Sequence, residues 1–267
     1  MKKIFILLVV SLAFVTTAFQ GIEKPPTAMP DMSFKDGEWF KFRIHYGIFN
    51  ASYAELDIKK SRLKGKKVYH IKGKGESTGL LDLFFKVDDK YETYIDRNTV
   101  KPYRFIRKIN EGGHKKNIQI DFDHEQGTAV VNNKKYKTVE TLSIKPQTQD
   151  MVSAFYHLRN VVNVDSLQVG DEFTLPMFFD NENYDFKLKF LKHDVVKTKF
   201  GKVKALKFRP YVQSGRVFEE EESLTVWISA DKNKIPLKIK ANILVGSITA
   251  DLDAFKGLKH SFKIIVD

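Results

Sequence analysis

The residues that could do chemistry do not form a recognisable catalytic motif. The seven histidines show neither the HExxH spacing of a zinc site nor a His and Asp pair at ligand spacing. No GxSxG nucleophile elbow occurs, and the lysine-rich segment at residues 72–77 lacks the GxxxxGK[ST] pattern of a phosphate-binding loop. The sequence therefore predicts no catalytic residue, no metal site and no cofactor.

Two acidic clusters have structural explanations. The first is typical of a turn and contains Asp121, Asp123, His124 and Glu125. The second is the run of four glutamates at residues 219–222, which a strand would divide between its two faces, so that a pair sharing one proton is not expected. A glycan hydrolase would need two carboxylates roughly 5 to 10 Å apart across a cleft, and it is the least favoured function.

Aromatic residues support a binding function better. The chain has 22 phenylalanines and 10 tyrosines, and a curved antiparallel sheet with one helix can close over an apolar cavity. The alternative is that these side chains simply fill the core. The predicted ligand-binding residues, with the helix as plug or lid, are Phe84, Phe85, Met151, Phe155, Tyr156, Leu158, Phe178, Phe179 and Trp227.

The N-terminus has the pattern of a secretory signal. Two lysines precede an apolar run at residues 4–15, and small residues lead to Ala18, after which we expect cleavage. About 12 apolar residues are too few to cross a bilayer, which needs roughly 20. We expect residues 1–18 to be a signal peptide, residues 19–33 a Pro-rich leader, and the product to be soluble, not membrane-spanning, and periplasmic or else extracellular.

The charge and the cysteine content limit the partners and the source of stability. The chain carries +12, and loss of two lysines with the signal leaves +10, which favours anionic surfaces such as lipid headgroups or glycans. Nucleic acid is not expected for an exported chain, and the spread of the lysines also fits a solvated sheet face. With no cysteine, stability must come from the core.

Residues 224–252 give the clearest structural prediction. Leu224, Val226 and Ile228 alternate with polar residues, as in a half-buried strand, and a polar turn follows before Pro236. Alternation then resumes until Gly246, which indicates a bulge or a close backbone approach.

Similar alternation recurs along most of the chain, with one exception. Residues 148–162 have helical spacing, with apolar positions at Met151, Phe155, Leu158 and Val162. Thr148 or Asp150 can cap the first turn, and Arg159 lies near the negative end of the helix dipole. The fold prediction is mainly β: a large antiparallel barrel, half-barrel or sandwich of about a dozen strands with one central amphipathic helix. We expect one β-rich domain at residues 34–267, with two similar halves joined near residues 148–170 as an alternative description.

Several short motifs resemble the family called domain of unknown function 3108. The motifs are Gly37-Glu38, Gly47 with Asn50-Ala51, the FFKV segment with Asp89 and Tyr94-Ile95-Asp96, the SAFYHLR helix, and Trp227-Ile228-Ser229 through Ile235-Pro236-Leu237 to Gly246-Ser247-Ile248. The resemblance implies an exported bacterial protein with a predominantly β fold, and it brings no catalytic residues. The signal and the composition are similar to those of a Bacteroidota member.

The predicted function is that of a soluble, non-catalytic protein of the cell envelope. It would bind an apolar ligand, a lipid or another envelope component. The alternative is a structural or interaction protein that docks on an outer-membrane complex or a glycan through its basic surface.

Overall fold

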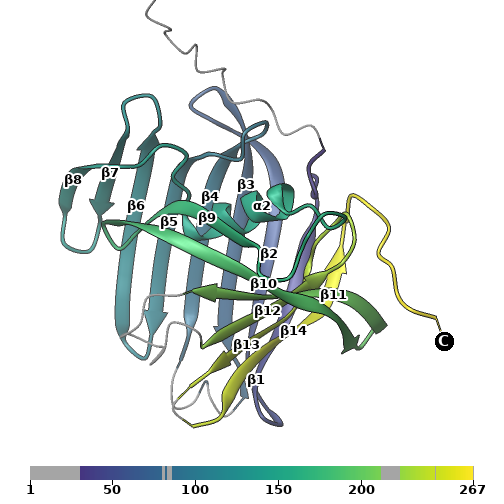
Figure 1. Ribbon diagram of the computed structural model, residues 1–267. Coiled ribbons are helices and arrows are strands. Elements are labelled where there is room, and N and C mark those ends of the chain that lie inside the picture. Colours follow the sequence, from purple (N-terminus) through teal and green to yellow (C-terminus); the bar gives the residue numbers. More distant parts are fainter. Residues whose placement is uncertain (1–30, 80–81, 83–85, 212–222, 244, 267) are drawn as a thin grey trace, which may run out of the picture.

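The computed structural model describes residues 31–79, 82, 86–211, 223–243 and 245–266 (Figure 1). The predicted signal peptide and most of the leader lie outside these residues. The strands of the described part are β1 (Trp39–Tyr46), β2 (Phe49–Leu63), β3 (Lys66–Ser77), β4 (Asp88–Asp96), β5 (Pro102–Glu111), β6 (His114–Asp123), β7 (Thr128–Asn133), β8 (Thr138–Ser143), β9 (Glu172–Phe179), β10 (Glu182–Thr198), β11 (Gly201–Tyr211), β12 (Leu224–Ser229), β13 (Pro236–Asn242) and β14 (Ser247–Lys256).

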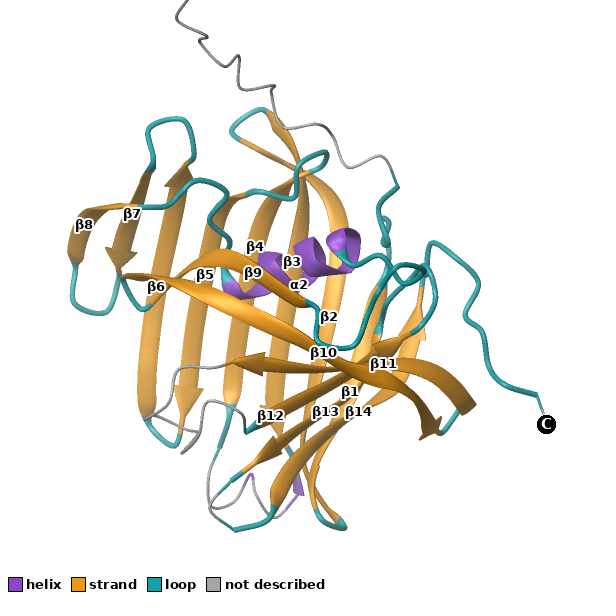
Figure 2. Cartoon of the chain, in the orientation of Figure 1, coloured by secondary structure: helices purple, strands orange, loops and turns teal. Residues whose placement is uncertain are grey.

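These strands form one curved antiparallel sheet of fourteen strands. Its order is β8-β7-β6-β5-β4-β3-β2-β1-β14-β13-β12-β11-β10-β9, so β1 pairs with both β2 and β14 and joins the two ends of the chain. Figure 2 shows the sheet wrapped around helix α2 (Met151–Val161). The predicted fold class, a mainly β, barrel-like antiparallel sheet with one central helix, is confirmed.

The β9–β10 hairpin folds back over the far end of the same sheet. The Gln149 N–H donates to the Pro176 carbonyl and the Phe178 N–H donates to the Gln149 carbonyl, both at 2.9 Å, just before α2 begins. Asn183 Nδ2 donates to the Ser143 carbonyl at 2.8 Å. Arg107 and Lys116 both contact the Asp180 carboxylate in the β9–β10 turn, at 2.7 and 3.2 Å. Side chains and loops therefore hold together two sheet edges that share no strand pairing.

Gly246 lies in the turn between β13 and β14. Its φ of +80° is in the left-handed region, and a Cβ there would lie 2.9 Å from Tyr46 Oη. The predicted close backbone approach is therefore present. The preceding strand is shorter than its alternation indicated, because β13 ends at Asn242 and the chain turns before β14.

Helix α2 begins with a buried capping box. Asp150 Oδ1 accepts the backbone N–H groups of Val152 and Ser153, both at 2.8 Å, and Ser153 Oγ accepts from the Asp150 N–H. Thr93 Oγ1 in β4 donates to the second Asp150 oxygen at 2.6 Å. Of the two caps proposed from the sequence, Asp150 is the correct one, and the same side chain fixes the helix to the sheet.

The buried face of α2 differs from the predicted stripe. Its buried residues are Val152, Ser153, Ala154, Tyr156 and Arg159, whereas Met151 is 40% exposed. The prediction followed the apolar residues, but the buried face includes Arg159, a charged residue that periodicity counts as solvent-facing.

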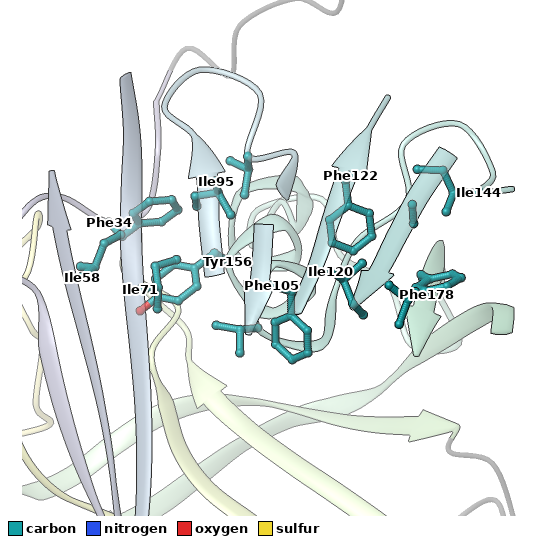
Figure 3. Close-up of a cluster of buried hydrophobic side chains, with 14 of the residues drawn as sticks. Phe34, Ile58, Ile71, Ile95, Phe105, Ile120, Phe122, Ile144, Tyr156 and Phe178 are labelled. Atoms are coloured by element: carbon teal, nitrogen blue, oxygen red, sulfur yellow. The ribbon is translucent and has the colours of Figure 1, made fainter. Parts of the chain in front are cut away.

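The main core lies between α2 and strands β2 to β7. Figure 3 shows Tyr156 of the helix beside Phe34 and Ile71 at one end of the cluster, and Phe178 at the other end near Ile120 and Ile144. Phe34 meets Tyr156 edge-to-face at a ring-centroid distance of 4.8 Å. Two further clusters fill the C-terminal half, one around Phe40, Leu237 and the C-terminal segment, the other around Phe190 and Phe208.

A buried ion pair joins the helix to the rest of the protein. The Arg159 guanidinium binds both Glu38 carboxylate oxygens, at 2.6 and 2.9 Å, and the two side chains are 2% and 0% exposed. Arg159 also donates to the backbone carbonyls of Asn233 and Ser33. One side chain thereby connects the leader, the start of β1, the helix and the β12–β13 turn.

Replacement of Glu38 by Gln should strongly destabilise the protein. It leaves the Arg159 charge buried without a counter-charge, so the free energy of unfolding should fall by about 3–5 kcal/mol in urea titrations. Lys145→Gln is the matched control, because it breaks an exposed pair with Asp185 and should cost below about 1 kcal/mol. Equal losses in the two variants would contradict the assigned role of the buried pair.

The Asp150 cap should make stability depend on pH. Burial raises the pKa of Asp150 from 3.8 to about 6, against the opposing effect of its hydrogen bonds. Because the pKa of Asp150 is higher in the folded protein than in the unfolded chain, protonated Asp150 contributes about 3 kcal/mol to the free energy of unfolding. This contribution is complete below pH 3.8 and is lost as pH rises through about 6.

Asp150→Asn keeps an acceptor for the helix N–H groups and does not titrate. The difference in unfolding free energy between wild type and this variant, measured from pH 3.5 to pH 7, should therefore shift in favour of the variant as pH rises. Asp185→Asn, at an exposed carboxylate, is the control. A difference that does not vary with pH would show that folding does not shift the pKa of Asp150.

Candidate functional site

The predicted ligand-binding residues do not form one surface. Tyr156 and Phe178 are 0% and 1% exposed and belong to the main core, against which Phe155 also packs. Leu158 packs between two other clusters. Phe84 and Phe85 lie outside the described residues.

The other predicted ligand-binding residues contact polar partners or solvent. The Arg107 guanidinium lies 4.6 Å from the ring centroid of Phe179. Trp227 donates its indole N–H to Asp194 at 3.0 Å and lies under the Lys207 ammonium. Met151 is partly exposed at the start of α2. Trp227 thus belongs to the β10–β12 region and not to the helix region.

The space beside Phe178 and Phe179 is small. A cavity there, bounded also by Phe105 and Ile120, has a volume of about 10 Å³, which is about enough for one water molecule. The hypothesis of an apolar ligand at the nine residues stays a prediction, and this cavity does not supply the room for it.

A much larger cleft lies at the other end of α2. Four segments meet there: the leader, the loop after α2, the β12–β13 turn and the C-terminal segment. Its volume of about 720 Å³ is within the range of small-molecule sites. We call this site the Lys234 cleft, and its lining includes Asp31, Ser33, Asp231, Lys232, Lys234 and His260.

The β12–β13 turn places Lys234 in this cleft. Asp231 Oδ1 accepts from Ser229 Oγ and from the backbone N–H groups of Asn233 and Lys234, at 2.8, 2.9 and 3.1 Å. These bonds hold Lys234 at a φ of 48°. Asn233 in turn bonds the backbone of His260, so the turn also positions the C-terminal segment.

Lys234 is an incompletely satisfied cation. Its residue is 9% exposed, and its ammonium donates to Ser33 Oγ at 2.9 Å, which uses one of three N–H groups. Burial lowers the pKa of Lys234, and the nearby Arg159 charge lowers it further. A buried cation with spare donors at the edge of a cleft is suited to an anionic ligand group.

Asp231 supplies the complementary acceptor. Its second oxygen, Oδ2, is buried and makes no hydrogen bond within the described residues. A buried carboxylate oxygen without a donor is costly, which favours a ligand hydroxyl or amide N–H at this position.

The remaining charges leave the cleft slightly cationic. Asp31 is paired with Lys259 at 2.8 Å, and this bond lowers the pKa of Asp31. Three lysines, Lys232, Lys234 and Lys263, then line the cleft together with two further carboxylates, those of Asp165 and Asp231. The arrangement suits binding, because the Ser33 hydroxyl accepts from the Lys234 ammonium and donates to the Arg159 carbonyl at 2.7 Å, so that Lys234 contacts Ser33 as a donor and not as a general base.

Of the two acidic clusters noted in the sequence, the one at residues 121–125 has structural partners, whereas the run at residues 219–222 lies outside the described residues. Asp123 Oδ1 accepts from two backbone N–H groups of its own turn, at 3.0 and 2.9 Å. Burial and a hydrogen bond with Asp89 raise the pKa of Glu111, so this carboxyl pair is in contact and lacks the separation of a glycosidase pair. Within the described residues, no group of three or more His, Asp and Glu side chains could hold a metal ion.

The family comparison matches most of the chain. Residues 41–253 match the sequence model of the family described as "Protein of unknown function (DUF3108)". The chain belongs to this family. No curated protein matches this DUF3108 chain.

A solved structure with a TM-score above 0.5 shares the fold of this DUF3108 protein, and two others match with lower scores. A β-barrel-like protein of domain of unknown function DUF1849 from Brucella abortus has a TM-score of 0.54 and 10% identity, covering 85% of this chain and 100% of that one. A candidate lipoprotein from Parabacteroides distasonis has a TM-score of 0.34, 10% identity and coverage of 87% and 100%. A candidate exported protein with a YmcC-like fold from Bacteroides fragilis has a TM-score of 0.34, 7% identity and the same coverage.

The DUF3108 match divides the Lys234 cleft. Arg159, Asp231 and Lys234 lie within the matched residues, whereas Asp31, Ser33 and His260 lie in the flanking segments. In the described part of this DUF3108 chain, no helix is both long and apolar enough to cross a membrane. The cleft was not predicted from the sequence, in which the polar turn at residues 231–234 and the helix arginine are the signals that point to it.

Lys234→Met should leave the protein as stable as wild type or more stable. The substitution removes a desolvated cation beside Arg159, so the free energy of unfolding at pH 7 should rise by about 0.5–2 kcal/mol. Urea unfolding of wild type and variant measures this difference. A loss above about 1 kcal/mol would show that the Ser33 bond makes Lys234 a structural residue.

Proposed function

We propose that this DUF3108 protein is exported and acts in the cell envelope as a non-catalytic binding protein. Its ligand is an anionic glycan fragment that bears hydroxyl or amide groups, and it binds in the Lys234 cleft. The observation that carries the proposal is the pairing, in one cleft, of a buried ammonium with spare donors and a buried carboxylate oxygen without a donor.

The two groups make opposite demands on a ligand. The Lys234 ammonium favours a carboxylate or phosphate oxygen, and Asp231 Oδ2 favours a donor such as a sugar hydroxyl or an amide N–H. An apolar lipid chain would satisfy neither group and would leave both desolvated. An acidic glycan carries both kinds of group, and the basic charge of the chain favours its approach.

The rigid surroundings of the cleft support binding over turnover. The Arg159–Glu38 pair and the Asp231 turn hold the polar atoms in place through buried hydrogen bonds. Such a site is preorganised for a ligand of matching shape. The alternative of a protein partner on the basic surface stays a prediction.

The proposal is tested with muramidase-solubilised peptidoglycan fragments, which carry carboxylates, hydroxyls and amides. Residues 19–267 should bind them saturably in calorimetric titrations. Lys234→Gln and Asp231→Asn should each weaken binding about tenfold or more, because each removes one charge-assisted hydrogen bond. Lys204→Gln, an exposed lysine on β11, is the matched control and should bind as wild type does.

Native mass spectrometry of protein purified from its own envelope identifies the natural ligand. A co-purifying acidic glycan that is lost from Lys234→Gln would support the proposal. A co-purifying lipid that both cleft variants retain would contradict it and would favour the apolar-ligand prediction.

A further inference from the structure

Exposed apolar side chains gather at the tips of two neighbouring hairpins. The β1–β2 turn carries Ile48 and Phe49, which are 90% and 66% exposed, and the β13–β14 turn carries Val245, which is 70% exposed. Tyr46 Oη donates to the Val245 carbonyl at 3.0 Å, so the two turns are in contact. Both lie at the end of the sheet that is lowest in Figure 1.

Strand pairing makes the apolar residues continuous. Tyr46 is opposite Phe49 in β2 and opposite Ile248 in β14, and its ring lies against Gly246. Tyr46 and Ile248 are 41% and 40% exposed. We call these five residues the apolar tip: Tyr46, Ile48, Phe49, Val245 and Ile248.

Cations lie just behind the apolar tip. Arg43 of β1 and Lys240 of β13 are exposed, and within the described residues neither forms an ion pair. The acidic residue nearest to them in the strand register, Asp251, is already paired with His45 at 2.8 Å and with Lys238 at 3.6 Å. The surface behind the tip is therefore available to anions.

We propose that the apolar tip docks this protein on the surface of an anionic lipid bilayer. Two protruding turns insert their apolar side chains at the level of the acyl chain boundary, and Arg43 and Lys240 reach the headgroup phosphates. In this docked position Tyr46, with an apolar ring and a bonded hydroxyl, lies at the level of the lipid headgroups, where tyrosine is enriched in membrane proteins.

The shape of the apolar tip disfavours two other roles, an interface with a second copy of this chain and a bilayer-spanning element. A stable dimer buries about 800 Å² and 20 to 30 residues on each partner, far more than five side chains on two convex turns can provide. The tip is also too small for a bilayer-spanning element and is suited to shallow insertion.

Vesicle flotation tests the docking surface. Residues 19–267 should float with vesicles of phosphatidylethanolamine and phosphatidylglycerol and should bind phosphatidylcholine vesicles more weakly. The vesicle partition coefficient of the double variant Ile48→Ser with Phe49→Ser should be lower than that of wild type by about tenfold or more, because each apolar side chain that enters the bilayer contributes to insertion. Val169→Ser, which removes a 71% exposed apolar residue from the loop before β9, should float as wild type does.

A second pair of variants separates charge from insertion. Arg43→Gln and Lys240→Gln should each reduce binding to anionic vesicles about fivefold and leave binding to phosphatidylcholine unchanged. All the substituted side chains are exposed, and thermal unfolding of each variant should match wild type.

A site-specific probe locates the inserted residues. Because the chain has no cysteine, Ile48→Cys can be labelled uniquely with an environment-sensitive dye. Its emission should shift to the blue with anionic vesicles, whereas the same dye at Val169→Cys should not shift. The proposal is overturned by a wild-type chain that does not float, by floating of the Ile48/Phe49 variant equal to wild type, or by a dye at residue 48 that does not respond.

Discussion

The salt bridge between Arg159 and Glu38 is the interaction on which the arrangement of this protein depends. Two opposite charges taken out of water are stable only when their hydrogen bonds are complete, and here the guanidinium bonds both carboxylate oxygens and two backbone carbonyls. Aromatic rings surround the guanidinium, with the Phe40 and Phe155 centroids within 5.5 Å. The pair therefore fixes the position of four segments that are distant in sequence.

The Lys234 cleft is a consequence of this buried pair. Arg159 binds the carbonyl of Asn233 and so holds the β12–β13 turn. The next residue is Lys234, whose ammonium is therefore held close to the buried Arg159 guanidinium. Burial of the Lys234 ammonium beside another cation is unfavourable for folding, and the hydrogen bond to Ser33 offsets this cost only in part. Local electrostatic cost of this kind is common at binding sites, where a ligand supplies the missing partner.

Two sets of residues show how far the sequence can be interpreted. In strand β1 the apolar residues Phe40, Phe42 and Ile44 alternate with polar residues, and a sequence can show this pattern because a strand with one buried face places an apolar residue at every second position. The buried face of α2 could not be found in the same way, since Arg159 is buried by a partner 121 residues away. The predicted ligand-binding residues were selected for aromatic character, and that property does not separate Tyr156 in the core from Phe179 beneath Arg107.

The sequence by itself determined the fold class, the central helix with Asp150 among its candidate caps, the family and the expectation of export, because periodicity, capping and motifs are local properties of the chain. The tertiary structure alone decided which polar residues meet. The cleft combines Ser33, Asp231 and Lys234, and the apolar tip combines residues from two hairpins almost 200 positions apart. These contacts depend on β1 pairing with β14, a long-range register that no local pattern encodes.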